Sequence, residues 1–491
     1  MGGFGQDPEK EISDGRETDY NWPLAMEPLW PGQVAAWCGG EWFPREPREP
    51  LRALCIDSRR ARPGSLFFAL PGEHADGHAY LSEVAAAGGR AVVRADVSLD
   101  RLPLTGSCLR VEDPRAALGR LAAAYRREMP ARVVGITGSV GKTTTKELVA
   151  DLLATVGKTA RTSGNCNNEI GLPLSVAGLS RDCAFGVFEA GISHPGDMVP
   201  LRDVLMPDVA VVTRIGPVHI EFFESVRAIA EEKAALVDKL PADGFAVLDL
   251  DDPHVAVLRA RCPAPVVTYS LQRREADYAG EAQADGMLWV CERATGETAT
   301  LPLPPPGGYM AQNTLAAVAV ARRCGAAWPA IATALSRTRP VGMRWAVEDV
   351  HGWTAINDGY NANPVSMPAA LDAFAAWPAP GRKFLALGPM LELGRLEKSE
   401  HEALGRLVAA GRWAGVAVVP VADGPSAAAA PSLVDGLVSA GFARKSICAA
   451  RDPAEAAAWL RERLRPGDAL LLKASRGLRI ETILDHLQKE S

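Results

Sequence analysis

A β-rich segment, a glycine-rich loop and a helical pattern follow one another at residues 132–156 and constrain the fold more than any other feature. The segment Arg132–Thr137 reads RVVGIT, and apolar residues recur at helical spacing across Lys142–Val156. Glycines between them let backbone N–H groups close on phosphate oxygens at a helix N-terminus, where the helix dipole favours negative charge. We therefore predict a phosphate-binding loop made of Thr137, Gly138, Ser139, Val140, Gly141, Lys142, Thr143 and Thr144.

The match to the P-loop pattern GxxxxGK[ST] is incomplete. Ile136 stands where the first glycine is expected, and Gly135 lies one residue earlier. In a P-loop, Lys142 would neutralise the β- and γ-phosphates and the Thr143 hydroxyl would ligate Mg²⁺. The alternative interpretation is a glycine-rich turn with a chance lysine. The loop alone does not distinguish a kinase, a hydrolase and a ligase.

Apolar runs alternate with helical segments over most of the chain. Those near the loop are Phe185–Phe188, Val209–Val212 and Phe245–Leu250. A proline-rich stretch, Leu301–Gly308, and an alanine-rich helix at 312–323 precede a second series of runs at Lys383–Leu387, Val416–Val421 and Ala469–Leu472. Continuous apolar strands that alternate with helices indicate an α/β fold with doubly wound parallel sheets.

The length of 491 residues predicts roughly three domains. Residues 1–25 are polar and without periodicity, so we expect a disordered tail. Residues 26–130 are expected to form a small α/β domain, and residues 131–340 a central domain around the phosphate loop. Residues 341–491 are expected to form a third, Rossmann-like α/β domain.

Composition excludes several classes of protein. The net charge of −6 does not suit a general nucleic-acid binder. Nine cysteines without a CxxC pair indicate reduced thiols in a cytoplasmic protein. The N-terminus lacks the apolar core of a secretory signal, and no apolar run is long enough to span a membrane.

Three further residues stand where a ligand-binding group would lie. Glu189 ends an apolar strand, and acids are seldom buried unless they are paired or bound to a metal. His219 follows the turn after Val209–Val212, and Lys233 lies in a helical segment, AEEKAA. Taken singly, each also has a structural interpretation: a solvated strand end, a structural histidine and a surface lysine.

In combination, these motifs resemble the Mur ligases, ATP-dependent enzymes that build the peptide of bacterial peptidoglycan precursors. The resemblance runs from about residue 50 to the C-terminus. It rests on TGSVGKTTTKE, NCNNEIGLPL (165–174), FEAGISHPGDM (188–198) and PVHIEFFESVRAIAEEKAAL (217–236). The segments IDSR (56–59) and PGSLFFALPG (63–72) resemble the N-terminal UDP-substrate domain shared by the ligases that add the third residue and the terminal dipeptide. NDGYNANP (357–364) resembles the C-terminal signature of the dipeptide-adding member.

The resemblance implies a function. The enzyme would join D-alanyl-D-alanine to UDP-N-acetylmuramoyl-tripeptide through an acyl phosphate, with ATP as the energy source. It implies two Mg²⁺ ions, held by Thr143, Glu189, His219 and Lys233, and a CO₂-derived carbamate on Lys233. The expected partners are these small molecules alone, and the expected state is a monomer.

The resemblance also implies roles for single residues. Lys142, Lys233, Arg344 and His219 would be catalytic, and Arg344 would reach the γ-phosphate. Asn313 and Asp358 would contact the nucleotide. The UDP-linked substrate and the dipeptide would meet Ser58, Arg59, Asn167, Asn168, Tyr360, Asn361 and Asn363.

Five residues depart from the family pattern. Tyr309-Met310 stands in place of His-Asn, Val365 and Pro389 replace aspartates, and Ala474 replaces a glycine. We interpret them as neutral variation because the phosphate and metal positions are intact. The alternatives are a folylpolyglutamate or cyanophycin-type ligase, a kinase, and a nucleotide-binding regulator without ligase activity.

Overall fold

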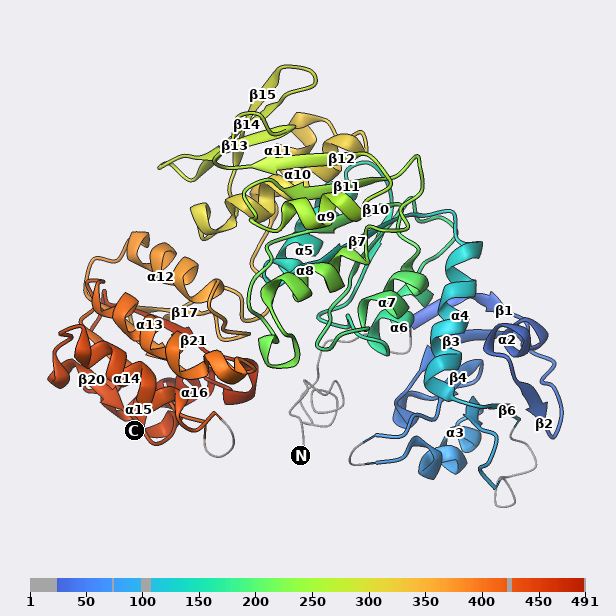
Figure 1. Ribbon diagram of the computed structural model, residues 1–491. Coiled ribbons are helices and arrows are strands. Elements are labelled where there is room, and N and C mark those ends of the chain that lie inside the picture. The colour runs from blue at the N-terminus through green and yellow to red at the C-terminus, as the bar shows by residue number, and fades with distance from the viewer. Residues whose placement is uncertain (1–23, 73–74, 99–106, 422–425, 490–491) are drawn as a thin grey trace.

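The computed structural model describes residues 24–72, 75–98, 107–421 and 426–489. Almost all of the tail predicted at 1–25 lies outside the described residues. Three sheets follow one another along the chain, and each organises one lobe (Figure 1). This confirms the predicted three-part α/β fold. The chain passes from the first sheet to the second between residues 111 and 132, and from the second to the third between residues 302 and 346. The exact domain boundaries at 25, 130 and 340 stay predictions.

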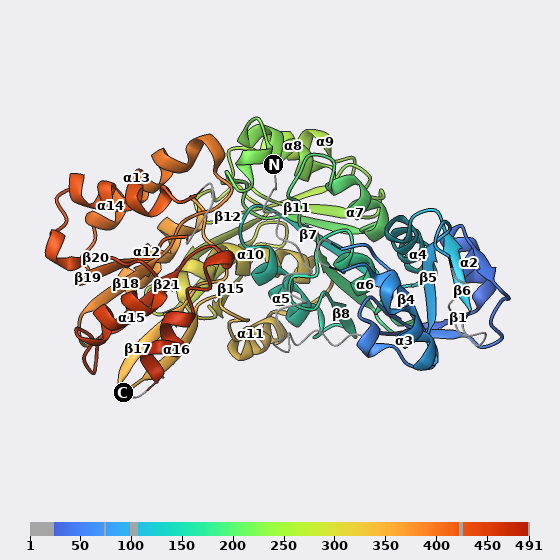
Figure 2. The ribbon, with the colours of Figure 1, turned by 90° about the horizontal axis from the view of Figure 1, so that it is seen from below.

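The first lobe, here the N-terminal domain, has a six-stranded mixed sheet in the order β1-β3-β4-β5-β6-β2. Helix α4 connects it to the central domain and packs against α6 and α7 of that domain (Figure 2). The elements are β1 (Leu24–Leu29), α2 (Pro31–Cys38), β2 (Glu41–Phe43), β3 (Leu51–Cys55), β4 (Ser65–Phe68), α3 (Leu81–Ala86), β5 (Arg90–Arg94), β6 (Cys108–Val111) and α4 (Pro114–Glu128).

The central domain is built on a nine-stranded sheet in the order β15-β14-β13-β12-β11-β10-β7-β9-β8. Its strands are β7 (Arg132–Thr137), β8 (Thr159–Arg161), β9 (Phe185–Glu189), β10 (Val209–Val212), β11 (Phe245–Asp249), β12 (Val266–Ser270), β13 (Tyr278–Ala282), β14 (Met287–Glu292) and β15 (Glu297–Pro302). Its helices are α5 (Lys142–Leu153), α6 (Gly171–Ala177), α7 (Met198–Leu205), α8 (Val226–Ala234), α9 (Val255–Arg261), α10 (Ala311–Arg323) and α11 (Trp328–Arg337).

Alternation of side chains along the buried strands explains the two helical layers of the central domain. Val209 and Val211 face α5, α10 and α11, whereas Ala210 and Val212 face the layer that contains α6 to α9. Strands β7 to β12 are parallel, as predicted. Strands β14 and β15 add an antiparallel extension that the sequence analysis did not predict.

The C-terminal domain carries a six-stranded sheet in the order β16-β17-β21-β18-β19-β20, parallel except for β16. Its strands are β16 (Ala346–Val350), β17 (Trp353–Asn357), β18 (Lys383–Leu387), β19 (Gly415–Val418), β20 (Ile447–Ala449) and β21 (Ala469–Lys473). Its helices are α12 (Ser366–Ala376), α13 (Glu397–Ala409), α14 (Ala429–Ser439), α15 (Pro453–Arg461) and α16 (Thr482–Gln488).

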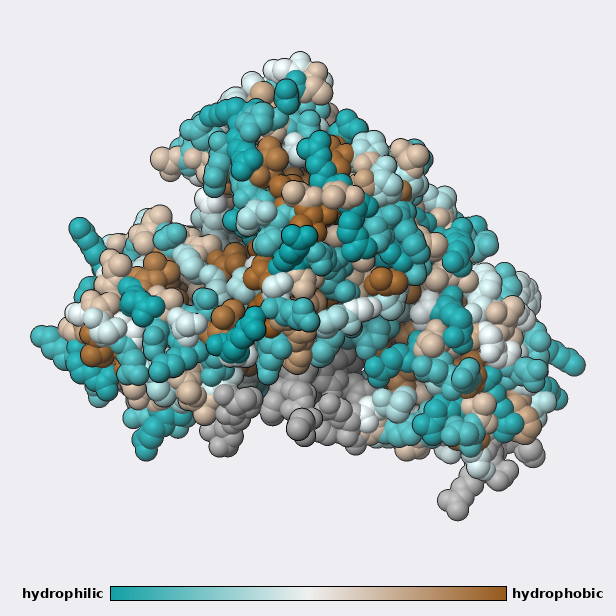
Figure 3. Space-filling view, viewed as in Figure 1, coloured by the Kyte–Doolittle hydropathy of each residue, from teal (hydrophilic) through white to brown (hydrophobic). Residues whose placement is uncertain are grey.

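Short 3-10 helices connect several of these elements, at Ser58–Arg60, Gly77–Tyr80, Ile220–Phe222, Gly307–Met310, Gly394–Leu396, Arg444–Ser446 and Arg476–Leu478. On the face shown in Figure 3, hydrophobic side chains gather where the C-terminal lobe meets the central lobe. Within the described part of the chain, no helix is both long and apolar enough to cross a membrane.

Strand register brings the candidate site to one edge of the central sheet. Ile136 pairs with Glu189 and Thr137 pairs with Val212, so β7, β9 and β10 end side by side. In an open α/β sheet, ligands bind outside the carboxyl ends of the strands where the strand order reverses. The phosphate loop after β7 lies at that point.

Candidate active site

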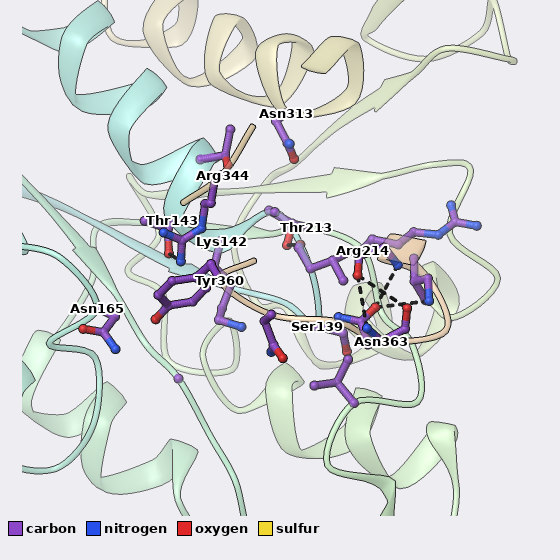
Figure 4. A pocket seen from close by; sticks show the side chains of 18 of the residues that line it. Ser139, Lys142, Thr143, Asn165, Thr213, Arg214, Asn313, Arg344, Tyr360 and Asn363 are labelled. Carbon is purple, nitrogen blue, oxygen red and sulfur yellow. Dashed lines mark hydrogen bonds between the residues drawn. The ribbon is translucent and has the colours of Figure 1, made fainter. Parts of the chain in front are cut away.

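A large cavity lies at this edge of the central sheet and is lined by all three domains. It encloses about 2070 Å³ and contains the phosphate loop, the loop after β10 and residues 358–363 of the C-terminal domain. The N-terminal domain contributes only Ile56 among the described lining residues. Figure 4 shows side chains from the central and C-terminal domains converging on the loop.

The phosphate loop is braced by the chain that follows β10. The backbone N–H groups of Ser139 and Val140 donate to the carbonyl of Arg214, at 2.7 and 3.4 Å. The Thr213 hydroxyl donates to the carbonyl of Val140 at 2.6 Å. Only glycine fits at 138, where a Cβ would lie 1.9 Å from the Thr213 hydroxyl oxygen. The predicted strand, loop and helix are therefore held in a fixed shape.

Lys142 begins helix α5 and folds back over the loop. Its ammonium donates to the carbonyl of Gly138 at 3.0 Å. The pKa of Lys142 is lowered, chiefly because the amine is removed from water; Arg344 acts in the same direction and Glu189 opposes it. The amine is held beside the Gly138 carbonyl, and an anionic ligand in the cavity would stabilise its charged form.

Thr143, Glu189 and Arg344 form a linked group across two domains. The Thr143 hydroxyl donates to the Glu189 carboxylate at 2.7 Å, and the Asn167 amide donates to its other oxygen at 2.7 Å. Arg344 donates to the Thr143 oxygen at 3.0 Å. The guanidinium also lies 3.6 Å from the centre of the Tyr360 ring. Figure 4 shows these two side chains next to each other. The separate roles predicted for these residues in binding phosphate, metal and substrate stay predictions.

Lys233 lies on the buried face of α8 and is not among the described residues that line the cavity. Ser225 caps that helix by accepting the N–H of Ala228 at 3.1 Å, which sets the position of Lys233 two turns later. The side chain is 2% exposed, so it is not the surface lysine of the alternative interpretation. Burial lowers the pKa of Lys233 well below its ordinary range, and the charge of Lys142 acts in the same direction.

His219 lies in the cavity wall with a left-handed backbone, at φ 59°. Its Nδ1 contacts the carboxylate of Glu392, from the C-terminal domain. The sequence analysis did not single out Glu392 as a site residue.

The oxygen donors near the phosphate loop suit one Mg²⁺. Among the described residues, no group of three or more His, Cys, Asp and Glu side chains could hold a metal ion. The Thr143 hydroxyl and the Glu189 carboxylate are hard oxygen donors and suit one Mg²⁺ beside bound phosphates. His219 and an unmodified Lys233 supply no oxygen. A second Mg²⁺ fits there only if Lys233 carries a carboxylate.

The two predicted nucleotide-contacting residues have protein partners. Asn313 lies behind the loop, where its amide oxygen accepts from the Thr145 hydroxyl at 3.3 Å. Asp358 forms a buried ion pair with Lys473, with 2.5 Å between the amine and the carboxylate. Lys473 also donates to the carbonyl of Asn361 at 3.1 Å. Asn313 and Asp358 both line the cavity.

Some predicted substrate-binding asparagines have local structural roles. The Asn168 amide oxygen accepts the N–H of Gly171 at 2.9 Å, at the start of α6. The Asn363 amide oxygen accepts the N–H of Ser366 at 2.8 Å, at the start of α12. These residues line the cavity together with Asn167, Tyr360 and Asn361. Their contact with substrate stays a prediction.

Ser58 and Arg59 are not brought into this cavity. The Ser58 hydroxyl donates to Glu83 at 3.3 Å. Arg59 pairs with Asp57 at 2.8 Å and is 73% exposed. Both lie in a 3-10 helix of the N-terminal domain. Their contact with a UDP-linked substrate stays a prediction.

The sequence analysis missed a charged group beside the loop. Arg214 lies in the cavity wall, 3.4 Å from the carboxylate of buried Asp249 and 4.0 Å from that of Asp252. Desolvation raises the pKa of Asp249 to about 6. The signal was present in the sequence, because Asp249 lies within the run Phe245–Leu250 and two further aspartates follow it.

Three of the residues that depart from the family pattern have identifiable neighbours in the structure. Val365 packs on Gly216, where an added Cβ would lie 2.4 Å from its Cγ2. Ala474 is fully buried, and its methyl group would lie 2.7 Å from a Cβ at Gly388. Pro389 accepts the N–H of Ser475 at 3.2 Å. Nothing in the structure explains Met310.

Comparison with known proteins identifies the family. The model described as "Mur ligase middle domain" matches residues 136–321, and "Mur ligase, glutamate ligase domain" matches 343–476. A third, "Mur ligase family, catalytic domain", matches 50–126. This chain belongs to the Mur ligase family.

Individual Mur ligases resemble the chain over most of its length. The UDP-N-acetylmuramoyl-tripeptide–D-alanyl-D-alanine ligase of Mycobacterium bovis is 34% identical, over 88% of this chain and 91% of that protein. The Bacillus subtilis enzyme of the same name is 32% identical, over 90% and 94%. A crystal structure of MurF from Acinetobacter baumannii superposes with a TM-score of 0.84 at 27% identity, covering 95% of this chain and all of that one. MurF from Thermotoga maritima in complex with ADP gives 0.74 at 28% identity, over 89% and 97%.

Proposed function

We propose that this Mur ligase joins D-alanyl-D-alanine to UDP-N-acetylmuramoyl-tripeptide, using ATP and releasing ADP and phosphate. The observation that carries the proposal is the group formed by Lys142, Thr143, Glu189 and Arg344. It offers two cations and a hydroxyl–carboxylate pair at one end of a cavity shared by three domains. The names of the relatives supply the substrate. The predicted cytoplasmic location and monomeric state belong to the same proposal.

The chemical difficulty is to bring a carboxylate anion to an anionic phosphate. In the proposed reaction, a carboxylate oxygen of the tripeptide forms a bond to the γ-phosphorus and the bond to ADP breaks. The neutral dipeptide amine would then attack the acyl carbon. The bond from that carbon to the phosphate oxygen breaks, and phosphate and one amine proton leave. Lys142 and Arg344 would offset the repulsion and stabilise the charge of the transferred group.

Mg²⁺ bound beside the phosphates would neutralise negative charge and orient the transferred group. Thr143 and Glu189 are the residues that would hold it. Lys233 would join a second site as a carbamate. Its lowered pKa supports this, because only the neutral amine reacts with CO₂.

Arg344 belongs to the C-terminal domain and Lys142 to the central domain, so the reaction would need both domains together. Their contact would also exclude water from a reactive acyl phosphate. The contact of Arg344 with Thr143 at 3.0 Å supports this arrangement.

The test is phosphate release from ATP with Mg²⁺, bicarbonate and UDP-N-acetylmuramoyl-tripeptide, with and without D-alanyl-D-alanine. Tripeptides ending in lysine and in diaminopimelate are compared. We expect release that depends on the dipeptide, together with the mass of the pentapeptide product. Phosphorylation without an amide product would support a kinase instead. ATP binding without any turnover would support a regulator.

A further inference from the structure

Trp345 has a strained backbone next to the candidate site. It lies between Arg344 and the first residue of β16, in the segment that leads from the central domain into the C-terminal domain. Its backbone is left-handed, at φ 61°, although its side chain is large and only 1% exposed. The left-handed region is unfavourable for a bulky residue, and such conformations persist only where surrounding contacts enforce them. Contacts of Trp345 therefore enforce this turn.

Aromatic rings from both domains hold the indole ring of Trp345. Tyr309, in the 3-10 helix before α10 of the central domain, stacks on it with 5.7 Å between ring centres. Trp377, directly after α12 of the C-terminal domain, meets it edge-on at 6.3 Å. Such pairs are favourable beyond the area that they bury. The indole N–H has no hydrogen-bond partner among the described residues, so packing rather than hydrogen bonding fixes the ring.

The fixed ring determines where Arg344 can lie. On the other side of Arg344, the carbonyl of Met343 accepts the N–H of Tyr360 at 3.1 Å. Arg344 is thus held between an anchored peptide group and an anchored ring, and from there its guanidinium reaches Thr143. Without the indole ring, the backbone at Trp345 would be free to leave the left-handed region, because that region costs energy for any residue with a Cβ. The chain would then carry Arg344 away from the phosphate loop.

We propose that Trp345 is a positioning residue, which holds Arg344 toward the phosphate loop by keeping a left-handed turn directly after it. The inference rests on the proposed role of Arg344 at the γ-phosphate. If Trp345 served the core alone, glycine would be at least as harmful as alanine, since both remove the ring and glycine is the more flexible. If Trp345 acts through the turn, glycine should be the better substitute, because glycine adopts a positive φ without steric cost.

The experiment compares the affinities of the full-length chain for a β,γ-imido analogue of ATP and for ADP, both with Mg²⁺, by isothermal titration calorimetry. The ratio of the two affinities reports the contact with the third phosphate. Arg344→Ala should lower this ratio by roughly 10-fold, which is what a hydrogen bond to a charged group contributes. Trp345→Ala should lower it by nearly as much and Trp345→Gly by clearly less. Trp345→Phe, which keeps an aromatic ring, should bind like the wild type.

Three further variants separate positioning from packing. If Trp345 acts only through Arg344, the double variant Arg344→Ala/Trp345→Ala should have the same ratio as Arg344→Ala alone. Phe374→Ala is the matched control, because Phe374 is fully buried in α12 and is not among the described residues that line the cavity. It should lower Tm and leave the ratio unchanged. Tyr309→Leu removes a half-buried stacking partner and should lower the ratio, which keeps the test available if Trp345→Ala does not fold.

Equal losses in Trp345→Ala and Trp345→Gly would overturn the proposal, and so would a further loss in the double variant or the same fall in Phe374→Ala. An unchanged ratio in Arg344→Ala would overturn it together with the role of Arg344 at the γ-phosphate. No peptide substrate is present, so the ligation product does not enter the result. A chain that shows the expected ratios but no dipeptide-dependent phosphate release would refute the proposed substrate and keep the positioning role.

Discussion

Asp249 gives the prediction with the clearest magnitude. Its carboxyl group is 1% exposed at the end of β11, and desolvation raises its pKa from 3.8 to about 6. The folded chain therefore holds the proton more tightly than the unfolded chain between these two values. Stability from this group is fully present below the lower value and is lost as the pH rises through the higher one.

The difference of 2.2 pH units corresponds to a destabilisation of about 3 kcal/mol above pH 6. At pH 5, the same two values give about 1.6 kcal/mol. Asp249→Asn cannot ionise, and its amide oxygen can still accept the N–H of Asp251, at 2.9 Å in the wild type. The substitution should stabilise the protein, and by more at pH 8 than at pH 5.

Thermal melting at pH 5 and pH 8 checks this. A gain of about 3 kcal/mol would raise Tm by several degrees for a domain of this size. Asp285→Asn, at an exposed turn between β13 and β14, controls for the loss of a carboxylate. Equal shifts at both pH values, or a less stable Asp249→Asn at pH 8, would refute the reasoning that burial rather than the Arg214 pair dominates at Asp249.

Three further predictions concern contacts of the site. Lys142→Ala should reduce turnover by at least about 100-fold in the phosphate-release assay while Tm changes little, because a transition-state charge loses its partner; near-normal turnover would exclude the assigned role. Lys473→Met should destabilise the chain by about 3–5 kcal/mol in denaturant titration, since Asp358 is left buried and unpaired. The double variant with Asp358→Asn should recover most of that loss, and no recovery would argue against the pair. Gly216→Ala places a methyl group against Val365 and should lower turnover without loss of ATP binding. The second substitution Val365→Ala should restore turnover. A matching loss of ATP binding would instead locate the effect in the phosphate loop.

The sequence predicted the framework of the central and C-terminal sheets well. Val209–Val212 and Lys383–Leu387 are strands with the predicted limits, because a strand covered on both faces is a continuous apolar run. The extension β13–β15 was missed. In Met287–Glu292, less buried and more buried residues alternate, as in a strand with one face toward solvent. The prediction relied on continuous apolar runs that alternate with helices, and this segment has neither.

Sequence reasoning was weaker for the roles of polar side chains. An asparagine that caps a helix and one that binds a substrate lie in the same kind of loop, so Asn168 and Asn363 could not be separated by pattern. Their partners become visible only in three dimensions. Glu392 could not be predicted from the sequence for a different reason: the residue that it contacts belongs to another domain.

The Thr143 hydroxyl serves two domains at once. Its proton goes to Glu189, and one of its lone pairs takes the hydrogen bond from Arg344. A divalent cation that binds the remaining lone pair would come next to a guanidinium of like charge, and the two would repel each other. Cation binding would therefore release Arg344 from Thr143 and leave it to the nearest anion, the nucleotide phosphates. The contact would then act as a place-holder that a bound cation displaces.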